Sequence, residues 1–116
     1  MIKYFLWFWF IAPTKESVYL ECKNQGVFFP EIVTAQAILE TGHFQSYNCN
    51  NRNNLFGLYD SRNKRYFEFN NWQESVKAYR DFVQYKYSGG DYYDFLDSIG
   101  YAEAENYTRV LMMIKI

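Results

Sequence analysis

The 116-residue sequence predicts a mainly α (α+β) domain in which several helices surround one small β-hairpin. Helix-capping residues recur before apolar runs that follow the helical period. Residues 55–69 instead combine two short apolar runs with a polar turn between them, which is the pattern of a hairpin. A chain of this length buries about two-thirds of its unfolded surface, enough for one core. We therefore expect one domain over residues 14–116.

The first 13 residues form a separate apolar segment. Residues 1–12 are almost wholly apolar around Lys3, in the order of charge and then apolar residues that secretory signals have. The run is too short to cross a bilayer as a helix, and no clear small-x-small cleavage site follows it. Two interpretations stay open: an export or anchor segment, or an extension that packs on a protein partner.

A first helix is predicted from Thr14 to about Gln25. Thr14 is a residue type that caps helices, and Gly26 suits the position after the last turn. Val18 and Cys22 lie one turn apart, so we expect both to face inward.

The strongest helix signal covers residues 30–41. Pro30 suits the first turn, and Gly42 suits the left-handed position that ends a helix. Glu31 lies at the positive end of the helix dipole. Apolar side chains recur on one face at the helical period: Ile32, Val33, Ala35, Ala37, Ile38 and Leu39. We expect the rest of the chain to be organised around this helix.

One carboxylate, Glu40, lies in the last turn of this helix, with Gln36 one turn before it on the same face. There it meets the negative end of the helix dipole and the low dielectric of apolar neighbours, and both raise the pKa of a carboxyl group. A catalytic general acid needs such a pKa. From the helix alone, the alternative is a solvated residue just before the helix cap.

The middle of the chain is predicted as a loop followed by the hairpin. Residues 45–54 are polar and rich in Asn, so we expect a loop. Residues 55–59 predict a strand, with Gly57 at a point where another group approaches closely. Residues 60–64 form a polar turn, and residues 65–69 predict the returning strand.

Three further helices are predicted after the hairpin, which makes five in all. Asn71 with Glu74 resembles a capping box, at the start of a helix that runs to about Tyr87. Asp91 caps a short helix, and a last helix starts at about Glu103. The side chains expected on the inner faces are Trp72, Ser75, Val76, Tyr79, Phe82, Val83, Lys86, Phe95, Leu96, Ile99, Tyr107, Val110, Leu111 and Ile114.

The composition argues against a nucleic-acid binder. The net charge is −1, so the basic surface of such proteins is absent. Arg62, Lys64 and Arg65 form one basic cluster, which is either a solvated turn or a site of attraction for an anionic polymer. Aromatic residues make up 22% of the chain, more than a small core can hide. We expect some of them to line a groove or to face a partner.

Cysteine and histidine are scarce. Cys22 and Cys49 are too few for a disulfide framework and lack the spacing of a metal site. They are either joined in one bridge or are two buried thiols. His43 is the single histidine, which excludes a zinc site of several histidines, and its pairing with Cys49 is a weak pattern for a nucleophile. The sequence implies no metal and no organic cofactor.

Carboxylate chemistry is what remains. The sequence has no glycine-rich phosphate loop and no serine-hydrolase or metalloprotease motif. Glycoside hydrolysis uses pairs of carboxyl groups. The candidates are Glu40, Asp60, Glu68 and Glu74.

Four ordered motifs resemble the glucosaminidase family of peptidoglycan hydrolases, glycoside hydrolase family 73 of the lysozyme-like superfamily. Residues 37–42 (AILETG) match a helix that ends A-x-x-E-[ST]-G, and residues 54–57 (NLFG) match the opening of a small β-lobe. Residues 69–75 resemble the segment that leads out of the lobe, and residues 99–107 resemble a C-terminal G-Y-A…Y motif. The hairpin looks most like the compact domains of Bacteroidetes and their phages. The resemblance implies a lysozyme-like helical domain with a small β-hairpin lobe.

The resemblance also implies site residues. Glu40 would be the general acid that protonates the glycosidic oxygen. Tyr107 would face the cleft and hold the sugar or orient the site. Phe56 and Gly57 would shape the floor of the groove, and Tyr101 would add a stacking wall. Core packing is the alternative for Tyr107 and for Phe56.

The second carboxylate of the family does not align, because the β-lobe is cut to a tight hairpin. Asp60, at the hairpin turn, is the first candidate for it and Glu68 is the second, although Glu68 also reads as a solvent-facing strand residue. Glu74 is better explained as a helix cap, and Ala78 stands where many relatives have an Asp. Without a second carboxylate, the N-acetyl group of the substrate would supply the nucleophile.

The function implied is that of an endo-β-N-acetylglucosaminidase that cuts the bond between N-acetylglucosamine and N-acetylmuramic acid in peptidoglycan. One alternative is a muramidase or lytic transglycosylase on the same fold. Another is a non-catalytic cell-wall-binding or virion structural module. The expected location is the cell envelope or periplasm, the outside of the cell, or a phage virion, where the apolar N-terminus would meet a virion or envelope protein.

Overall fold

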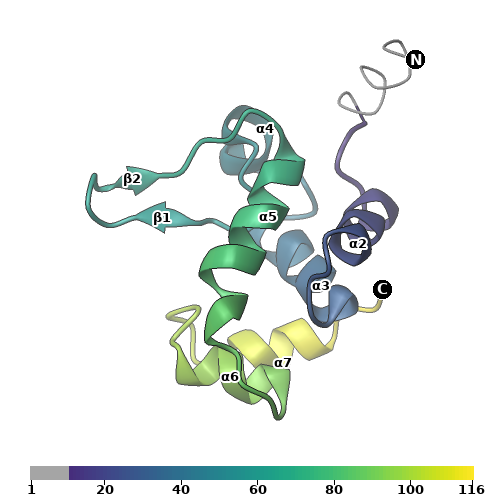
Figure 1. Cartoon of the computed structure of the whole chain (residues 1–116), viewed down its shortest axis with the longest axis vertical. Helices are drawn as coiled ribbons and strands as arrows, with labels where there is room; N and C mark the ends of the chain where they lie inside the picture. Colours follow the sequence, from purple (N-terminus) through teal and green to yellow (C-terminus); the bar gives the residue numbers. More distant parts are fainter. Residues whose placement is uncertain (1–10) are drawn as a thin grey trace.

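A computed structural model describes residues 11–116 and confirms the mainly α (α+β) fold (Figure 1). This part of the chain contains six α-helices, one 3-10 helix and a two-stranded antiparallel sheet. All but the last three residues of the apolar segment predicted over residues 1–13 lie outside the described residues. The elements in order are α2 (Lys15–Asn24), α3 (Pro30–Thr41), α4 (Tyr47–Arg52), β1 (Tyr59–Asp60), β2 (Arg65–Tyr66), α5 (Trp72–Phe82), η1 (Gln84–Lys86), α6 (Tyr92–Ser98) and α7 (Tyr107–Met112).

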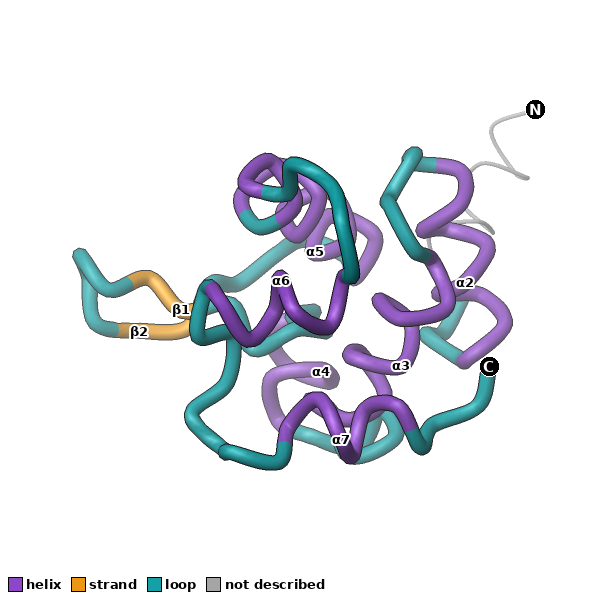
Figure 2. The backbone as a smooth tube through the Cα atoms, turned by 90° about the horizontal axis from the view of Figure 1, so that it is seen from below, coloured by secondary structure: helices purple, strands orange, loops and turns teal. Residues whose placement is uncertain are grey.

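Helix α3 lies in the middle of the fold. Helices α2 and α7 both pack against it, α5 packs against α2, and α6 packs against α7. The hairpin of β1 and β2 projects away from the helices in both views (Figures 1 and 2). Its register pairs Tyr59 with Tyr66 and Asp60 with Arg65. The prediction that the chain is organised around α3 is therefore confirmed.

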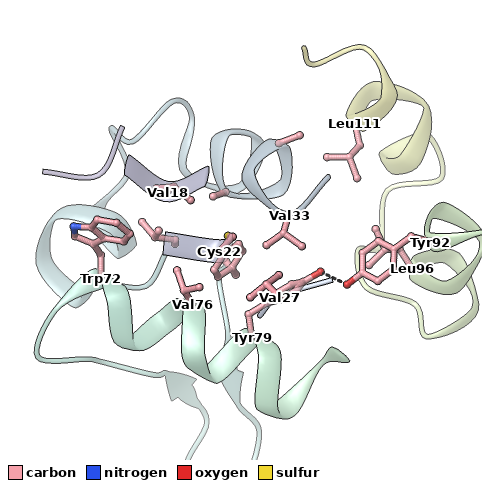
Figure 3. Packing of buried hydrophobic residues seen from close by; sticks show 14 of the residues in the cluster. Val18, Cys22, Val27, Val33, Trp72, Val76, Tyr79, Tyr92, Leu96 and Leu111 are labelled. Carbon is pink, nitrogen blue, oxygen red and sulfur yellow. Dashed lines mark hydrogen bonds between the residues drawn. The ribbon is translucent and has the colours of Figure 1, made fainter. Parts of the chain in front are cut away.

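The core surrounds α3 and combines aliphatic side chains with tyrosines. All five residues from Val33 to Ala37 are buried, including the polar Gln36. Figure 3 shows Val76 of α5 beside Cys22 of α2, whereas Tyr79 of α5 is directed toward Tyr92 of α6. Leu96 and Tyr92 of α6 close the same cluster from the other end. Burial of these apolar side chains is the main force that holds the helices together.

Local sequence signals set most of the helix ends, as predicted. The Thr14 hydroxyl accepts a hydrogen bond from the Ser17 amide at 3.1 Å, and the Ser17 hydroxyl accepts one from the Thr14 amide at 2.8 Å. Gly42 ends α3 with φ of 56°, a left-handed conformation that costs glycine little. The Asp91 carboxylate accepts from the Asp94 amide at 3.0 Å and starts α6.

The predicted strands are longer than the observed ones. The side chain of Asn54, which is fully buried, bends residues 54–58 into a turn. Its Oδ1 accepts from the Leu58 amide at 3.0 Å, and its Nδ2 donates to the carbonyls of Leu58 at 2.9 Å and Phe67 at 3.0 Å. On the returning side, the Phe69 amide donates to the Arg52 carbonyl at 2.9 Å. These bonds leave only two residues on each side for strand pairing.

The loop predicted over residues 45–54 contains a short helix, so that prediction is wrong. Ser46 accepts from the Cys49 amide at 3.1 Å and caps α4. Burial of the Cys49 side chain attaches this helix to the core. Asn53 ends it in a left-handed conformation with φ of 53°, which Asn tolerates better than most residues.

Two helix boundaries and one residue of an inner face also differ from prediction in the second half of the chain. Helix α5 ends at Phe82, and Phe82 is 70% exposed, where the sequence predicted an inward residue. Beyond it the chain turns as η1, since the buried Gln84 amide binds the backbone of Phe28. The last helix begins at Tyr107 rather than at Glu103. The capping box is half formed: Asn71 accepts from the Glu74 amide, but Glu74 accepts from Asn70.

The structure settles the state of the two cysteines. Cys22 and Cys49 are both free and buried, so the bridge is excluded and the buried thiols are confirmed. Burial raises the pKa of Cys22 to about 12 and also raises the pKa of Cys49. Both side chains therefore remain thiols at neutral pH, and a thiolate nucleophile is not available from either.

Among residues 11–116, no helix has the length and apolar character needed to cross a membrane.

The buried Asn54 is expected to hold the lobe to the helices. We expect Asn54→Ala to lower the free energy of unfolding by about 2 kcal/mol or more, because it leaves the buried amide and carbonyls unpaired. Urea unfolding followed by circular dichroism measures this change. The matched control is Asn50→Ala, which removes an exposed bond to the Gln45 carbonyl and should change stability by less than about 0.5 kcal/mol. Equal stability of the two variants would contradict the role given to Asn54.

Candidate active site

Glu40 occupies the last turn of α3, where the helix end is firmly fixed. The Thr41 hydroxyl donates to the Ala37 carbonyl at 2.6 Å and accepts from the Phe44 amide at 2.7 Å. The left-handed Gly42 then turns the chain away. These contacts hold the backbone of Glu40, so its side chain leaves the helix in a defined direction.

The side chain of Glu40 lines a surface groove between the end of α3 and the start of α7. The groove has a volume of about 370 Å³. Its remaining lining comes from residues close in sequence to α7 and from Leu39, so two motifs distant in the chain meet here. The lining residues are Leu39, Glu40, Ala102, Glu103, Ala104, Asn106, Tyr107 and Val110.

The environment of Glu40 makes its carboxyl group a weaker acid than that of an ordinary glutamate. Partial burial raises the pKa of its carboxyl group above the ordinary value of 4.5, and a hydrogen bond from Tyr107 offsets part of this shift. The direction predicted from the sequence is confirmed. Burial is the main cause, because the charged form loses hydration in the groove wall.

Tyr107 joins the core to the groove. It is the first residue of α7 and is 8% exposed. Its hydroxyl accepts from Gln36 Nε2 at 3.2 Å, and its interaction with the Glu40 carboxyl lowers the pKa of that group. Gln36 and Glu40, one turn apart on α3, thus converge on the same phenol. Tyr107 is both packed in the core and part of the groove wall.

The start of the β-lobe packs against Glu40 through Gly57. This residue has φ of 62°, and a Cβ atom added to it would lie 3.4 Å from Glu40 Oε2. Any other residue would be strained at this φ, and its Cβ would be in van der Waals contact with the carboxylate. For Phe56 the structure favours core packing, the alternative to groove lining, because the residue is 2% exposed and its ring packs on Tyr79 with centroids 4.6 Å apart. Its side chain belongs to the core.

Tyr101 binds the lobe to the segment before α7. Its hydroxyl donates to the Phe56 carbonyl at 3.1 Å. Its ring packs on Tyr107 with centroids 5.7 Å apart and planes tilted by 31°. Burial raises the pKa of this phenol well above its ordinary value. Tyr101 therefore positions the groove wall, and its hydroxyl is already engaged within the protein.

The two carboxylates proposed as partners of Glu40 do not line the groove. Asp60 Oδ1 accepts from the amides of Arg62 and Asn63, and its Oδ2 accepts from Asn63 Nδ2 at 2.7 Å. The Asn63 hydrogen bond is the main cause of the lowered pKa of Asp60. Glu68 has a side chain 73% exposed that lies 3.8 Å from Arg52 Nε. Asp60 closes the hairpin turn, and Glu68 lies at the solvent surface.

Glu103 shares the groove with Glu40, and the sequence did not single it out. The motif match around Tyr101 and Tyr107 drew attention to the tyrosines and not to the residues between them. The sequence signal that could have marked Glu103 is its position between Tyr101 and Tyr107, the two tyrosines of the C-terminal motif. Asn106, which lines the same groove, was part of the motif but received no role.

A second, apolar groove of about 220 Å³ lies between the hairpin and α5. It is lined by Leu58, Tyr59, Phe67, Phe69, Ala78, Phe82 and Val83. Large exposed aromatic residues gather in this region, as the high aromatic content predicted. Within residues 11–116, no group of three or more His, Cys, Asp or Glu side chains is placed to hold a metal ion.

Comparison with known proteins identifies the family. The glucosaminidase family model, described as mannosyl-glycoprotein endo-beta-N-acetylglucosaminidase, matches residues 15–115. No curated protein and no solved structure matches the chain. The family match covers nearly all of the described fold, including Glu40, the hairpin and Tyr107. The chain therefore belongs to the glucosaminidase family, a family of glycoside hydrolases.

Proposed function

We propose that the protein hydrolyses the glycan strands of bacterial peptidoglycan as an endo-β-N-acetylglucosaminidase. The bond cut is the one between N-acetylglucosamine and N-acetylmuramic acid, and Glu40 is the general acid. One observation carries the proposal: a partly buried Glu40 with a raised pKa lines a groove inside a glucosaminidase-family domain. The substrate implies work at the cell envelope, outside the cell or in a phage virion.

The acid step follows from the contacts of Glu40. A carboxyl group with a raised pKa keeps its proton at higher pH, so more of it can protonate the glycosidic oxygen. Once the proton has left, the Tyr107 hydroxyl donates to the carboxylate that forms. The same phenol thus stabilises the charged state produced by bond cleavage. Gly57 leaves the space that the carboxyl group needs on the lobe side.

The second group of the reaction is proposed to be Glu103. Glycosidases of this kind pair an acid with a second carboxylate that activates water or attacks the sugar. Among the described carboxylates, Glu103 lines the groove with Glu40, whereas Asp60 and Glu68 do not. The N-acetyl group of the substrate is the alternative source of the nucleophile. Phe56 and Tyr101 do not line the groove and support its wall from the core. Tyr107 and Asn106 line the groove and are proposed to contact the sugar.

Replacing the acid tests the reaction and the bond. We expect Glu40→Gln to lower the rate of peptidoglycan digestion by about 10² to 10⁴, because general acid catalysis contributes that much. Mass spectrometry of fragments from purified peptidoglycan should show N-acetylglucosamine at the new reducing ends made by the wild type. The control is Glu31→Gln, an exposed residue in the first turn of the same helix, which should keep full activity.

Other products would redirect the assignment. Muramic-acid or anhydro-muramic ends would indicate a muramidase or a lytic transglycosylase with Glu40 still as the acid. Sedimentation of the protein with cell walls, without fragments from wild type or variant, would support the binding or structural module.

Stability should depend on pH through the same carboxyl group. The folded state holds the Glu40 proton more tightly than the unfolded chain, whose pKa is near 4.5. This contribution to stability is complete below about pH 4.5 and is lost as the pH rises through the folded-state pKa. Since Gln does not ionise, Glu40→Gln should unfold at higher urea concentration than the wild type at pH 7, with the difference shrinking toward pH 4. Parallel curves for the two proteins would contradict the raised pKa.

Replacing the second carboxylate separates the two proposed mechanisms. We expect Glu103→Gln to lower the digestion rate by at least about 10², as for loss of a general base, without changing which bond is cut. The matched control is Glu105→Gln, two residues away and outside the groove lining. A Glu103→Gln rate within about twofold of the wild type would assign the nucleophile to the N-acetyl group instead.

A further inference from the structure

We propose that a directed chain of hydrogen bonds crosses the core and holds the Tyr107 hydroxyl as a donor to Glu40. The members of this donor chain are, in order, Gln84, Tyr92, Tyr79, Gln36 and Tyr107. Tyr79 and Tyr92, which lie outside the groove, are then positioning residues of the active site. The inference rests on the proposed role of Glu40 as the general acid.

The donor chain begins at an amide whose orientation the backbone fixes. Gln84 is 2% exposed. Its Oε1 accepts from the Phe28 amide at 2.9 Å, and its Nε2 donates to the Phe28 carbonyl at 2.8 Å. A flipped amide would lose both bonds, so Nε2 has one orientation. Its second hydrogen goes to the Tyr92 hydroxyl oxygen at 2.9 Å.

The two buried tyrosines pass this direction on. The hydroxyls of Tyr92 and Tyr79 lie 2.7 Å apart, and Figure 3 shows them meeting between α5 and α6. The Tyr79 hydroxyl also contacts Gln36 Oε1, which can only accept. Tyr79 must therefore donate to Gln36, and Tyr92 must donate to Tyr79. The opposite orientation would leave the Tyr92 proton without an acceptor among these groups, which a buried hydroxyl seldom tolerates.

Gln36 completes the direction at the groove. Because its Oε1 is held by Tyr79, its Nε2 faces Tyr107 and donates to that hydroxyl oxygen at 3.2 Å. The phenol proton of Tyr107 is then free to point at the carboxyl group of Glu40. Every bond of the donor chain runs from the backbone of Phe28 toward the acid. Donors in such a chain polarise one another, which strengthens the last bond.

Breaking the donor chain should change the pKa of Glu40 as well as the packing of the core. In Tyr79→Phe, nothing holds Gln36 Oε1, so the amide can rotate and accept the proton of Tyr107. Glu40 then loses its donor while it keeps its partial burial. The charged form is disfavoured further, and the pKa of Glu40 rises above its wild-type value. The other titratable groups near this carboxyl are Tyr101 and Glu103, and Tyr79→Phe leaves both in place.

The test is the pH dependence of the initial digestion rate on purified peptidoglycan at limiting wall concentration. The alkaline limb reports the pKa of the acid in the free enzyme. For Tyr79→Phe we expect this limb to move up by about one pH unit, the size of one hydrogen bond to a charged group, with a lower maximal rate. Tyr87→Phe is the control, since it removes a hydroxyl bonded to the Gly90 carbonyl from the same aromatic cluster. Its limb should stay in place.

The outcomes separate the donor chain from the proposed function. A lower rate for Tyr79→Phe with an unmoved limb would overturn the donor chain and leave Tyr79 a structural role. If Tyr79→Phe does not fold, Tyr92→Phe removes the preceding hydroxyl and should move the limb in the same direction by less; an unmoved limb there overturns the donor chain too. Full activity of Glu40→Gln would instead overturn the proposed function.

Discussion

The candidate site depends on the partial burial of one carboxyl group at the end of a buried helix. Helix α3 is enclosed by α2 and α7, and it ends at Gly42. Glu40, in its last turn, is therefore half removed from water while its helix is held on several sides. The cost of charging a carboxyl group in that place raises its pKa. The other features of the site either maintain this burial or moderate it.

Three separate segments maintain it. The lobe presents Gly57, whose missing side chain lets the backbone pack against the carboxylate. Tyr101 ties the segment before α7 to the lobe through the Phe56 carbonyl. Tyr107 moderates the burial by donating a hydrogen bond. A buried polar network behind Tyr107 fixes that donor. If packing were the only requirement, an apolar residue could replace Gln36 in this core. The polar side chains of the core are thus explained by their effect on Tyr107 in the wall of the groove.

Sequence reasoning predicted the helices well and the lobe poorly. Caps such as Thr14 and Gly42 act within a few residues, so local sequence is enough to place them. The turn at residues 54–58 depends on a buried Asn54 that reaches Phe67 across the hairpin, a contact with no local signature. The raised pKa of Glu40 could be predicted because its position in the helix determines its surroundings. The presence of Glu103 in the groove beside Glu40 could not be predicted, because these two residues are brought together only when α7 packs on α3.

The most direct test of this account is a ¹³C NMR titration of the Glu40 carboxyl carbon in the wild-type protein, alongside the pH dependence of peptidoglycan digestion. We predict a titration midpoint above the ordinary value of 4.5 that coincides with the alkaline limb of activity. Agreement of the two would show that the proton held at Glu40 is the one used in the reaction. A midpoint at or below 4.5, or an activity limb that does not follow the titration, would contradict the central claim.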